Sequence, residues 1–490
     1  MIKSNKITNN FIPKYITRNA MLLYATLLIV ISMVFMNYAL RWMWIAFGVV
    51  EVFCFFYFSN FLTKAWGRYS DHLFARSLFG WALAIRVLYV IFSYFFYLKQ
   101  TGTPFEFGAA DVGFYHDMGQ YGASLLENGE FDLIPKFNKY SGGMAFSDTG
   151  YPIYLSVVYY LTGNNIFLTR VLKAVWSAWT VLLIYKLAKR NFTEPVARMA
   201  GILCMLMPNL IYYCGLHLKE TEMVFLMTLF IERADYVMRQ GKFVFTPTLV
   251  VVLSGLYLFM FRTVLGAVLF IAFFMALTLS STRLVSWGRR TILVVLSLAM
   301  LGLMFSNRIE EEILNISETN VQQQQQSNYE WRANRESGNS YAKYASSVVF
   351  APMIFTIPFP TMVETPHQEN QKMIHGGNFC KNITSFFTII ALLILIWPYD
   401  WRKRLLDGEW RKHVLPIAAL GGYLIVLVFS NFAHSERFHL PSIPLAMMFA
   451  AYGISNFDPK WKRWYWVWLA VIFVANIGWA YIKLRGRGMA

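Results

Sequence analysis

The chain has 490 residues, of which 57% are hydrophobic, 18% are aromatic and only 14% are charged. This composition excludes an ordinary soluble globular domain. The net charge is +17, but the basic residues lie in short segments between apolar runs, so nucleic-acid binding is not expected. The sequence predicts an all-α polytopic membrane protein, because a bilayer forces each spanning backbone to satisfy its own hydrogen bonds.

Apolar segments long enough to cross a bilayer recur along the chain. The predicted spans cover residues 20–38, 42–62, 78–98, 166–188, 197–216, 221–238, 244–260, 264–281, 291–306, 384–398, 414–430, 441–456 and 465–482. These segments indicate a bundle of about 12–13 transmembrane helices. The segment Tyr151–Leu161 is apolar but only about half a bilayer long. We expect it to lie along the outer surface or to enter the bilayer only part way.

The charges of the connecting segments predict the topology. The polar, basic N-terminus, Met1–Arg18, is expected to remain in the cytoplasm. Reading the loops alternately from there places most basic connections inside, as the positive-inside rule requires. The C-terminal residues Lys483, Arg485 and Arg487 are the exception, because thirteen spans put them outside. Either one span is miscounted, with Tyr151–Leu161 the first candidate, or the tail breaks the rule.

This reading divides the chain into four parts. Residues 1–77 hold the cytoplasmic N-terminus and two accessory helices, and residues 78–306 form a transmembrane module. Residues 307–383 form a flexible outer loop, and residues 384–490 form the C-terminal helices. The large first outer loop, 99–165, lies within the second part and is the expected catalytic loop, since loops usually carry the chemistry of a rigid scaffold.

The first outer loop is rich in carboxylates. Its segment Val112–Leu126 is expected to form an amphipathic helix on the membrane surface. Asp111 and Tyr115 are four residues apart and therefore share a helix face. Asp111 fits either an N-cap or a catalytic acid, and a carboxylate can be both. The other candidate substrate-binding residues of this loop are His116, Asp117, Asp148 and Tyr151.

Further polar residues occur at the predicted outer ends of later spans. Lys219 and Glu220 fit either a snorkelling lysine with a local ion pair or a charged pair at the mouth of a cavity. Arg170 and Arg262 fit either interface anchors or phosphate-binding groups. A late polar segment adds His434, Glu436, Arg437 and His439. Two His and a Glu could ligate a metal, but their spacing matches no standard site, so no metal ligand is assigned.

Several short motifs follow one another in a fixed order. They are Asp111 with Tyr115, Gly129, Gly150–Tyr151–Pro152, Leu161–Thr162–Gly163, Arg170, Tyr185–Lys186–Leu187–Ala188, Pro208, Glu220 and the late run Glu436–Pro444. In this order the chain resembles the polyprenyl-phosphate-sugar-dependent glycosyltransferases of the GT-C fold. These include the protein O-mannosyltransferases and the aminoarabinose lipid A transferases of glycosyltransferase family 39 and its neighbours. The resemblance covers roughly residues 78–240 and 431–456.

The resemblance implies a function and roles for particular residues. Asp111 matches the family's catalytic acid/base, and Glu220 matches an acid at the outer start of a later span. The family often has a second acid directly after the first, where this chain has Val112. The implied reaction moves a sugar with inversion from a polyprenyl-phosphate donor to a hydroxyl of a glycan, lipid or protein. Cationic side chains would hold the leaving phosphate, the candidates being Arg170, Lys219, Arg262 and Arg437.

The implied setting is a bacterial inner membrane, with the active site on the periplasmic side and membrane lipids around the bundle. No cofactor is assigned, and a divalent metal stays open. Two other functions remain: a polymerase or ligase of lipid-linked polysaccharide, whose active loop usually lies late in the chain, and a flippase or transporter of lipid-linked sugars. A transporter needs polar residues along a path through the membrane, for which Glu51, Arg86 and Lys173 are the candidates.

Overall fold

A computed structural model gives the fold of the chain. It describes residues 9–108, 110–141, 146–240, 244–280, 338–396, 409–430 and 432–489, together with Val295, Glu330, Ala333 and Asn334. These residues form helices and loops, without a strand; an isolated bridge joins Ala39 and Val363. The all-α prediction is confirmed. The predicted span 291–306 and the first part of the loop 307–383 lie almost wholly outside the described residues.

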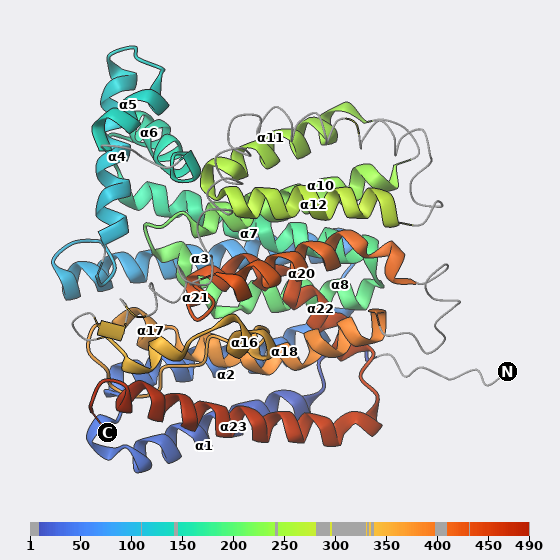
Figure 1. Ribbon diagram of the computed structural model, residues 1–490. Coiled ribbons are helices and arrows are strands. Elements are labelled where there is room, and N and C mark those ends of the chain that lie inside the picture. Colours follow the sequence, from blue (N-terminus) through green and yellow to red (C-terminus); the bar gives the residue numbers. More distant parts are fainter. Residues whose placement is uncertain are drawn as a thin grey trace.

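Long helices stack side by side to form the body of the molecule (Figure 1). The longest are α1 (Lys14–Val34), α2 (Trp42–Ala65), α3 (Asp71–Thr101), α7 (Ile166–Asn191), α10 (Glu220–Arg239), α18 (His375–Ile396) and α23 (Lys462–Arg485). Shorter members are α8 (Glu194–Leu206), α9 (Pro208–Tyr212), α11 (Phe245–Phe261), α12 (Thr263–Leu279), α20 (Val414–Phe429) and α22 (Ile443–Ser455). Among the described helices, seven are long and apolar enough to cross a membrane, or eight if α8 and α9 form one bent span. The polytopic prediction is therefore confirmed.

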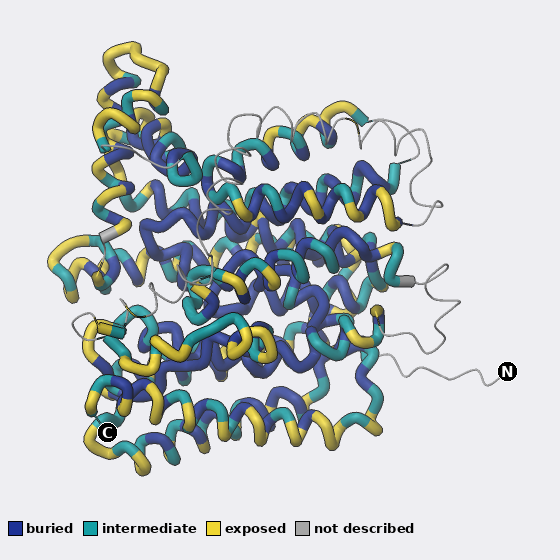
Figure 2. Tube along the Cα trace, viewed as in Figure 1, coloured by how far each residue is buried: buried dark blue, intermediate teal, exposed yellow. Residues whose placement is uncertain are grey.

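Burial separates an inner from an outer set of helices. Only 28% of the apolar window of α2 is buried and 33% of that of α23, whereas 83% is buried in the span that contains α22. Figure 2 shows the same contrast, with exposed positions along α1 and α23 and mostly buried ones along α8 and α22. The exposed positions of the outer helices are largely apolar, including Trp81, Leu88 and Val474. Such a surface suits lipid rather than water.

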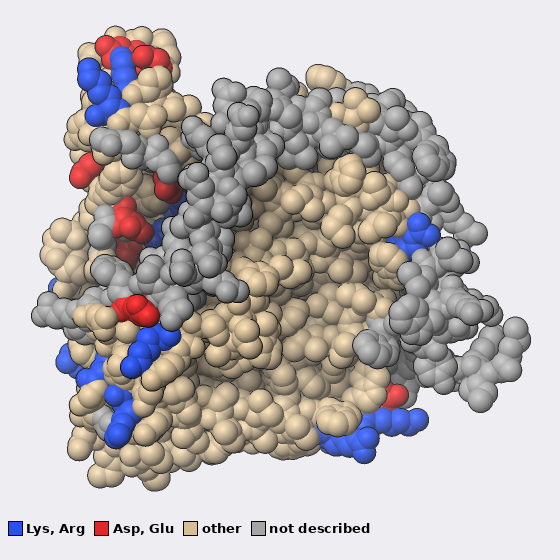
Figure 3. Space-filling model, viewed as in Figure 1, with Lys and Arg blue, Asp and Glu red and all other residues tan. Residues whose placement is uncertain are grey.

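The two ends of the bundle differ from the surface between them. On the face shown in Figure 3, the described Lys, Arg, Asp and Glu side chains lie towards the ends, and the described surface between is uncharged. The last helix, α23, finishes at the same end of the bundle as the short helices that follow α3, although on its far side (Figure 1). The C-terminal Lys483 thus lies at the end that carries these short helices. It is only 5% exposed and donates hydrogen bonds to Thr361, Gln368 and Gln371, at 2.6–2.9 Å. This lysine therefore serves packing between α23 and the segment before α18.

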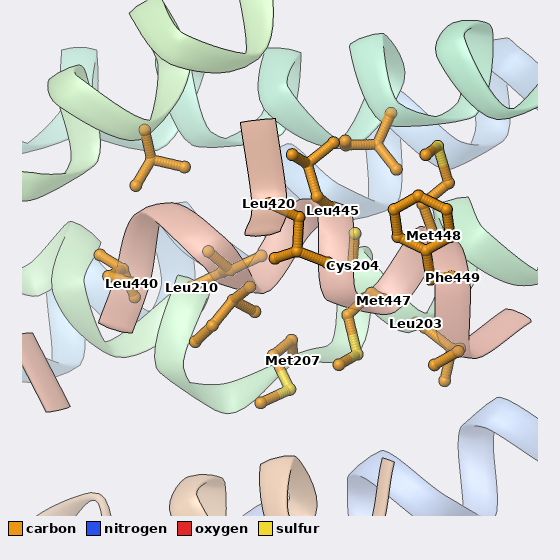
Figure 4. Packing of buried hydrophobic residues seen from close by; sticks show 14 of the residues in the cluster. Leu203, Cys204, Met207, Leu210, Leu420, Leu440, Leu445, Met447, Met448 and Phe449 are labelled. Carbon is orange, nitrogen blue, oxygen red and sulfur yellow. The ribbon is translucent and has the colours of Figure 1, made fainter. Parts of the chain in front are cut away.

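A bend between α8 and α9 is held by a buried arginine. Pro208 begins α9, and the two helices meet at an angle of 52°. Arg86 on α3 is fully buried and donates to the carbonyls of Cys204 and Met205, both at 3.2 Å, and to the Ser177 hydroxyl at 2.7 Å. The bend frees these carbonyls from the helical ladder, and the guanidinium supplies their donors. Apolar side chains of α8, α9, α20 and α22 pack around the same bend (Figure 4).

The helix α18 begins at His375, although the sequence predicts loop up to residue 383. Its first turns are polar, and several of their polar groups find partners inside the bundle. His375 Nε2 lies 2.8 Å from the Tyr24 hydroxyl, and the backbone N–H of Gly377 donates to Glu51 at 3.0 Å. Two N-terminal helices, α1 and α2, thus hold the start of α18. Glu51 and Arg86, two of the three candidates for a transport path, therefore have structural partners.

Candidate functional site

Three short helices after α3 form an arch at one end of the bundle: α4 (Ala110–Glu127), α5 (Leu133–Ser141) and α6 (Gly150–Thr162). Figure 1 shows the arch projecting beyond the long helices. A Cβ on Gly122 of α4 would lie 1.9 Å from the Ser156 hydroxyl of α6, so only glycine permits this close packing. The predicted helix over Val112–Leu126 is confirmed within α4, and α6, with 13 residues, is too short to span a bilayer.

One guanidinium joins three distant parts of the chain at the base of this arch. Arg437, on the short helix α21 (Glu436–His439), donates through Nη1 to Asp111 on α4 and through Nε to Glu220 at the start of α10. The Glu220 side chain is 0% exposed and that of Asp111 is 58% exposed. The buried carboxylate therefore anchors the arginine, while the other carboxylate remains open to an incoming hydroxyl group.

A second cation lies beside this triad. Lys219, in the loop before α10, pairs with Asp148 of the 3-10 helix η3 (Phe146–Asp148) and donates to the Phe261 carbonyl at 2.9 Å. Its Nζ also lies 5.9 Å from the centre of the Tyr115 ring. Burial lowers the pKa of the Lys219 ammonium from its ordinary value, and Asp148 opposes this shift by favouring the charged form.

Arg262 supplies a third cation, where the chain turns between α11 and α12. Its guanidinium stacks on the Phe438 ring with 4.2 Å between the guanidinium carbon and the ring centre. Its Nη1 is buried and finds no hydrogen-bond partner among the described residues. A buried guanidinium nitrogen without an acceptor is suited to bind the oxygen of an anionic ligand.

Other predicted site residues form a separate group behind Tyr115. The Tyr115 and Tyr151 rings meet edge to face at 5.2 Å, and Tyr151 is fully buried. His116 turns away from Asp111, and its Nδ1 lies 2.7 Å from the Tyr159 hydroxyl. Arg170 is fully buried and donates through Nη2 to the Pro104 carbonyl. His116, Tyr151 and Arg170 therefore do not join the Asp111 triad.

The late polar segment is used mostly for packing, with Arg437 the exception. His439 is buried between the Lys381 ammonium, 2.9 Å from Nδ1, and the Ala433 carbonyl, 2.7 Å from Nε2. His434 stacks near Phe350 with ring centres 6.4 Å apart. The Glu436 carboxylate interacts electrostatically with Lys483.

The structure does not bring His434, Glu436 or His439 to Asp111. Asp117, predicted with them, is exposed beside His116 and also lies outside the triad.

Sequence reasoning missed Glu106, His217 and Glu222, which are buried beside Arg170 and Tyr151. The backbone N–H of His217 donates to Glu106 at 3.3 Å, and Glu222 pairs with Lys173 at 3.3 Å. Glu106 and His217 lie in predicted connecting segments, where a polar residue gives no signal by itself. Glu222 was overlooked because the pair Lys219–Glu220, two residues earlier, offers a more obvious charged site.

The site suits an anion better than a metal ion. Among the described residues there is no group of three or more His, Cys, Asp or Glu side chains that could hold a metal. The two carboxylates of the triad, Asp111 and Glu220, already share the Arg437 guanidinium. A divalent cation would have to displace that guanidinium to reach them, so the residues present do not fit a resident metal.

Two family models match separate parts of the chain. Residues 150–237 match the model described as dolichyl-phosphate-mannose-protein mannosyltransferase. Residues 378–484 match that of the Alg9-like mannosyltransferase family. No curated protein matches the chain significantly. The first match includes Glu220 and the second includes Arg437, so the matches meet at the triad. Both matches agree with the resemblance drawn from the sequence motifs. Together with the apolar helices, they support a multi-pass membrane glycosyltransferase that uses a lipid-linked sugar donor.

Proposed function

We propose that the enzyme transfers a sugar from a polyprenyl-phosphate carrier to a hydroxyl group of a glycan, lipid or protein, with inversion at the anomeric carbon. The reaction takes place at the base of the arch. The observation that carries this proposal is the bridge that Arg437 forms between Asp111 and Glu220. It joins an accessible base, a buried anchor and a cation in one place, as the reaction requires.

Asp111 acts as the general base. Its carboxylate accepts the proton of the acceptor hydroxyl as that oxygen forms a bond to the anomeric carbon. The bond between this carbon and the phosphate oxygen breaks, and its electron pair leaves with the polyprenyl phosphate. A positioned general base of this kind contributes roughly 10²–10⁴-fold to a rate. A single displacement inverts the anomeric centre.

The leaving group is an anion and needs cations rather than a proton donor. The cations of the site are Arg437 within the triad and Lys219 and Arg262 beside it, and Arg262 has an unpaired buried nitrogen. Arg170, the fourth cation of the sequence analysis, lies behind Tyr151 and is not assigned to the phosphate. Two of the three cations are already paired with acids, which keeps them in place before the donor binds.

The arch faces away from the cytoplasm, in a bacterial inner membrane towards the periplasm. Support comes from the basic connections of the opposite end, which the positive-inside rule assigns to the cytoplasm. Two variants, each with one added exposed cysteine, test this orientation in intact cells; the exposed Cys54 is replaced by Ser, and Cys204, Cys214 and Cys380 are buried. A membrane-impermeant thiol reagent should label Asn128→Cys on the arch directly and Arg68→Cys at the opposite end only after permeabilisation. The reverse pattern would place the site in the cytoplasm.

The transfer itself is tested with the purified full chain in lipid nanodiscs. A panel of radiolabelled polyprenyl-phosphate mannose, glucose and galactose is offered with a membrane extract from host cells that lack the gene. We expect one donor to lose its sugar to an extract component, and Arg262→Ala to raise the KM for that donor. Arg68→Ala, which removes an exposed arginine at the opposite end, serves as the control. Absence of transfer from every lipid-linked donor would refute the proposed function.

A further inference from the structure

A second set of polar side chains lies behind Tyr115, and the proposed reaction leaves it unused. We name it the inner polar cluster; its members are Glu106, Tyr151, Arg170, Lys173, His217 and Glu222. Each of these residues is at most 4% exposed. They come from the loop after α3, from α6, from α7, and from the segment that includes the loop before α10 and its first turn. Four separate segments thus place buried polar groups in one region.

The cluster is compact. Lys173 Nζ lies 3.3 Å from a Glu222 carboxylate oxygen and 5.3 Å from the centre of the Tyr151 ring. The rings of Tyr151 and His217 are 6.1 Å apart, and the backbone of His217 binds Glu106 at 3.3 Å. His217 Nε2 is also bound, at 3.0 Å from the Tyr159 hydroxyl.

Despite these contacts, many polar atoms of the cluster have no hydrogen-bond partner among the described residues. They are one oxygen of Glu106, the Tyr151 hydroxyl, Nε and Nη1 of Arg170, Nδ1 of His217 and Oε1 of Glu222. Folded proteins leave few buried polar groups unpaired, and a concentration in one region calls for an explanation. A polar ligand that reaches this region would provide the missing partners.

The charges of the cluster identify the kind of ligand. Glu106 and Glu222 balance Arg170 and Lys173, and burial holds the pKa of His217 well below its ordinary value, so the ring stays neutral. An anion would be repelled by the carboxylates, and a cation by the guanidinium and ammonium groups. The unpaired atoms include both donors and acceptors. A neutral ligand whose groups donate and accept at once satisfies both.

We propose that the inner polar cluster binds the hydroxyl groups of the sugar ring carried by the donor lipid. This inference rests on the proposed function and adds the sugar subsite to it. Tyr151 contacts Tyr115 on one side and the cluster on the other. The sugar therefore lies on the cluster side of Tyr151 and the phosphate among Lys219, Arg262 and Arg437, with the scissile bond between them.

The loop that carries Glu106 offers a route of access. Gly102 and Gly108 flank it with φ values of +76° and +63°, in the left-handed region that glycine adopts readily. Between the two glycines, the loop is held by the donation from Arg170 to the Pro104 carbonyl and by a 2.8 Å bond from Asn370 to the Phe107 carbonyl. Its Phe105 and Phe107 rings also pack on neighbouring rings, with 5.7 Å between the Phe105 and His217 centres. Rotation at the two glycines would lift Glu106 from the cluster and admit the ring.

Binding of two lipids to the full chain in nanodiscs tests the proposal. The probes are the donor that proves active in transfer and polyprenyl phosphate without a sugar. We expect the wild type to bind the sugar-bearing lipid more tightly. Glu106→Gln, which keeps the shape of the side chain, should weaken that binding about tenfold, as loss of a hydrogen bond to a charged group does, and leave sugarless binding unchanged.

The matched control is Glu232→Gln, on the same helix α10 as Glu222. Glu232 is 1% exposed and paired with Arg190 at the opposite end of the bundle. Its substitution should leave the preference for the sugar-bearing lipid intact. Sugarless binding by each variant shows that the variant is folded.

Two results would overturn the sugar subsite: a wild type without preference for the sugar-bearing lipid, or Glu106→Gln weakening both lipids equally or neither. Since the wild type would still transfer sugar in those cases, the proposed function would stand.

Discussion

Replacing Asp111 by Asn separates catalysis from folding more clearly than any other single change in this site. The substitution keeps the shape of the side chain but removes the base that the proposed reaction needs. The Asp111 side chain is 58% exposed, whereas its guanidinium partner remains held by the fully buried Glu220. Neutralising Asp111 and neutralising Glu220, the two carboxylates paired with Arg437, should therefore have very different effects on stability.

The expected magnitudes follow from that difference in exposure. An ion pair open to solvent contributes up to about 1 kcal/mol, so the free energy of unfolding should change little in Asp111→Asn. Loss of a general base should slow transfer roughly 10²–10⁴-fold. That factor corresponds to about 3–5 kcal/mol on the activation barrier. The effect on the rate thus exceeds the effect on stability severalfold.

Both quantities can be measured on one nanodisc preparation. Single-turnover transfer from the labelled donor gives the rate of the chemical step, and thermal unfolding of the same sample gives the stability. Asp117→Asn, an exposed aspartate on the same helix and outside the triad, is the matched control and should keep its activity. Wild-type single-turnover rates in Asp111→Asn would remove this carboxylate from the mechanism.

Three further changes test the surroundings of the site. Glu220→Gln should lower the free energy of unfolding by about 1.5–3 kcal/mol, because a buried charge-assisted hydrogen bond is weakened; thermal unfolding unchanged from wild type would contradict the anchoring role. Gly122→Val should push α4 from α6 and reduce transfer, whereas Gly113→Ala, with open space around its added Cβ, should not; equal activities of the two would show that the close packing does not position Asp111. Burial lowers the pKa of His116 from its ordinary value, so on acidification the unfolded chain binds a proton before the folded chain does. Protection of α4 from hydrogen exchange should therefore fall as the pH is lowered from about 7 towards 5. An equally steep fall in His116→Asn would assign the effect to another group.

Much of the bundle could be predicted from the sequence, because a membrane helix is recognised by the length and hydropathy of its apolar segment. The predicted spans 42–62 and 166–188 lie within α2 and α7. The start of α18 was predicted late because Lys381 and other polar residues of its first turns resemble a loop. Lys381 in fact donates to His439 at 2.9 Å inside the bundle. Hydropathy measures the preference of an isolated side chain, and it cannot include a partner that is distant in the sequence.

The site was predicted in outline and not in its pairings. Residues at the outer ends of predicted spans did meet, as Asp111, Glu220 and Arg437 show. The predicted set was too wide because it treated every polar residue at that end as one group. Tyr151 divides those residues into two groups, and His439 is used within its own loop. Which groups pair depends on the direction of each side chain, which helical periodicity gives only coarsely.

The arginine at the bend between α8 and α9 limits how this enzyme can move. Straightening the bend would leave the Arg86 guanidinium in an apolar interior without its carbonyl acceptors, and no carboxylate is bonded to it among the described residues. Such a bend resists opening and closing during each turnover. We therefore expect the central helices to stay fixed during turnover. Binding and release of the long lipid carrier would then depend on movement of the arch and its neighbouring loops. Cross-linking the central helices should then be tolerated, whereas tethering the arch to them should stop turnover.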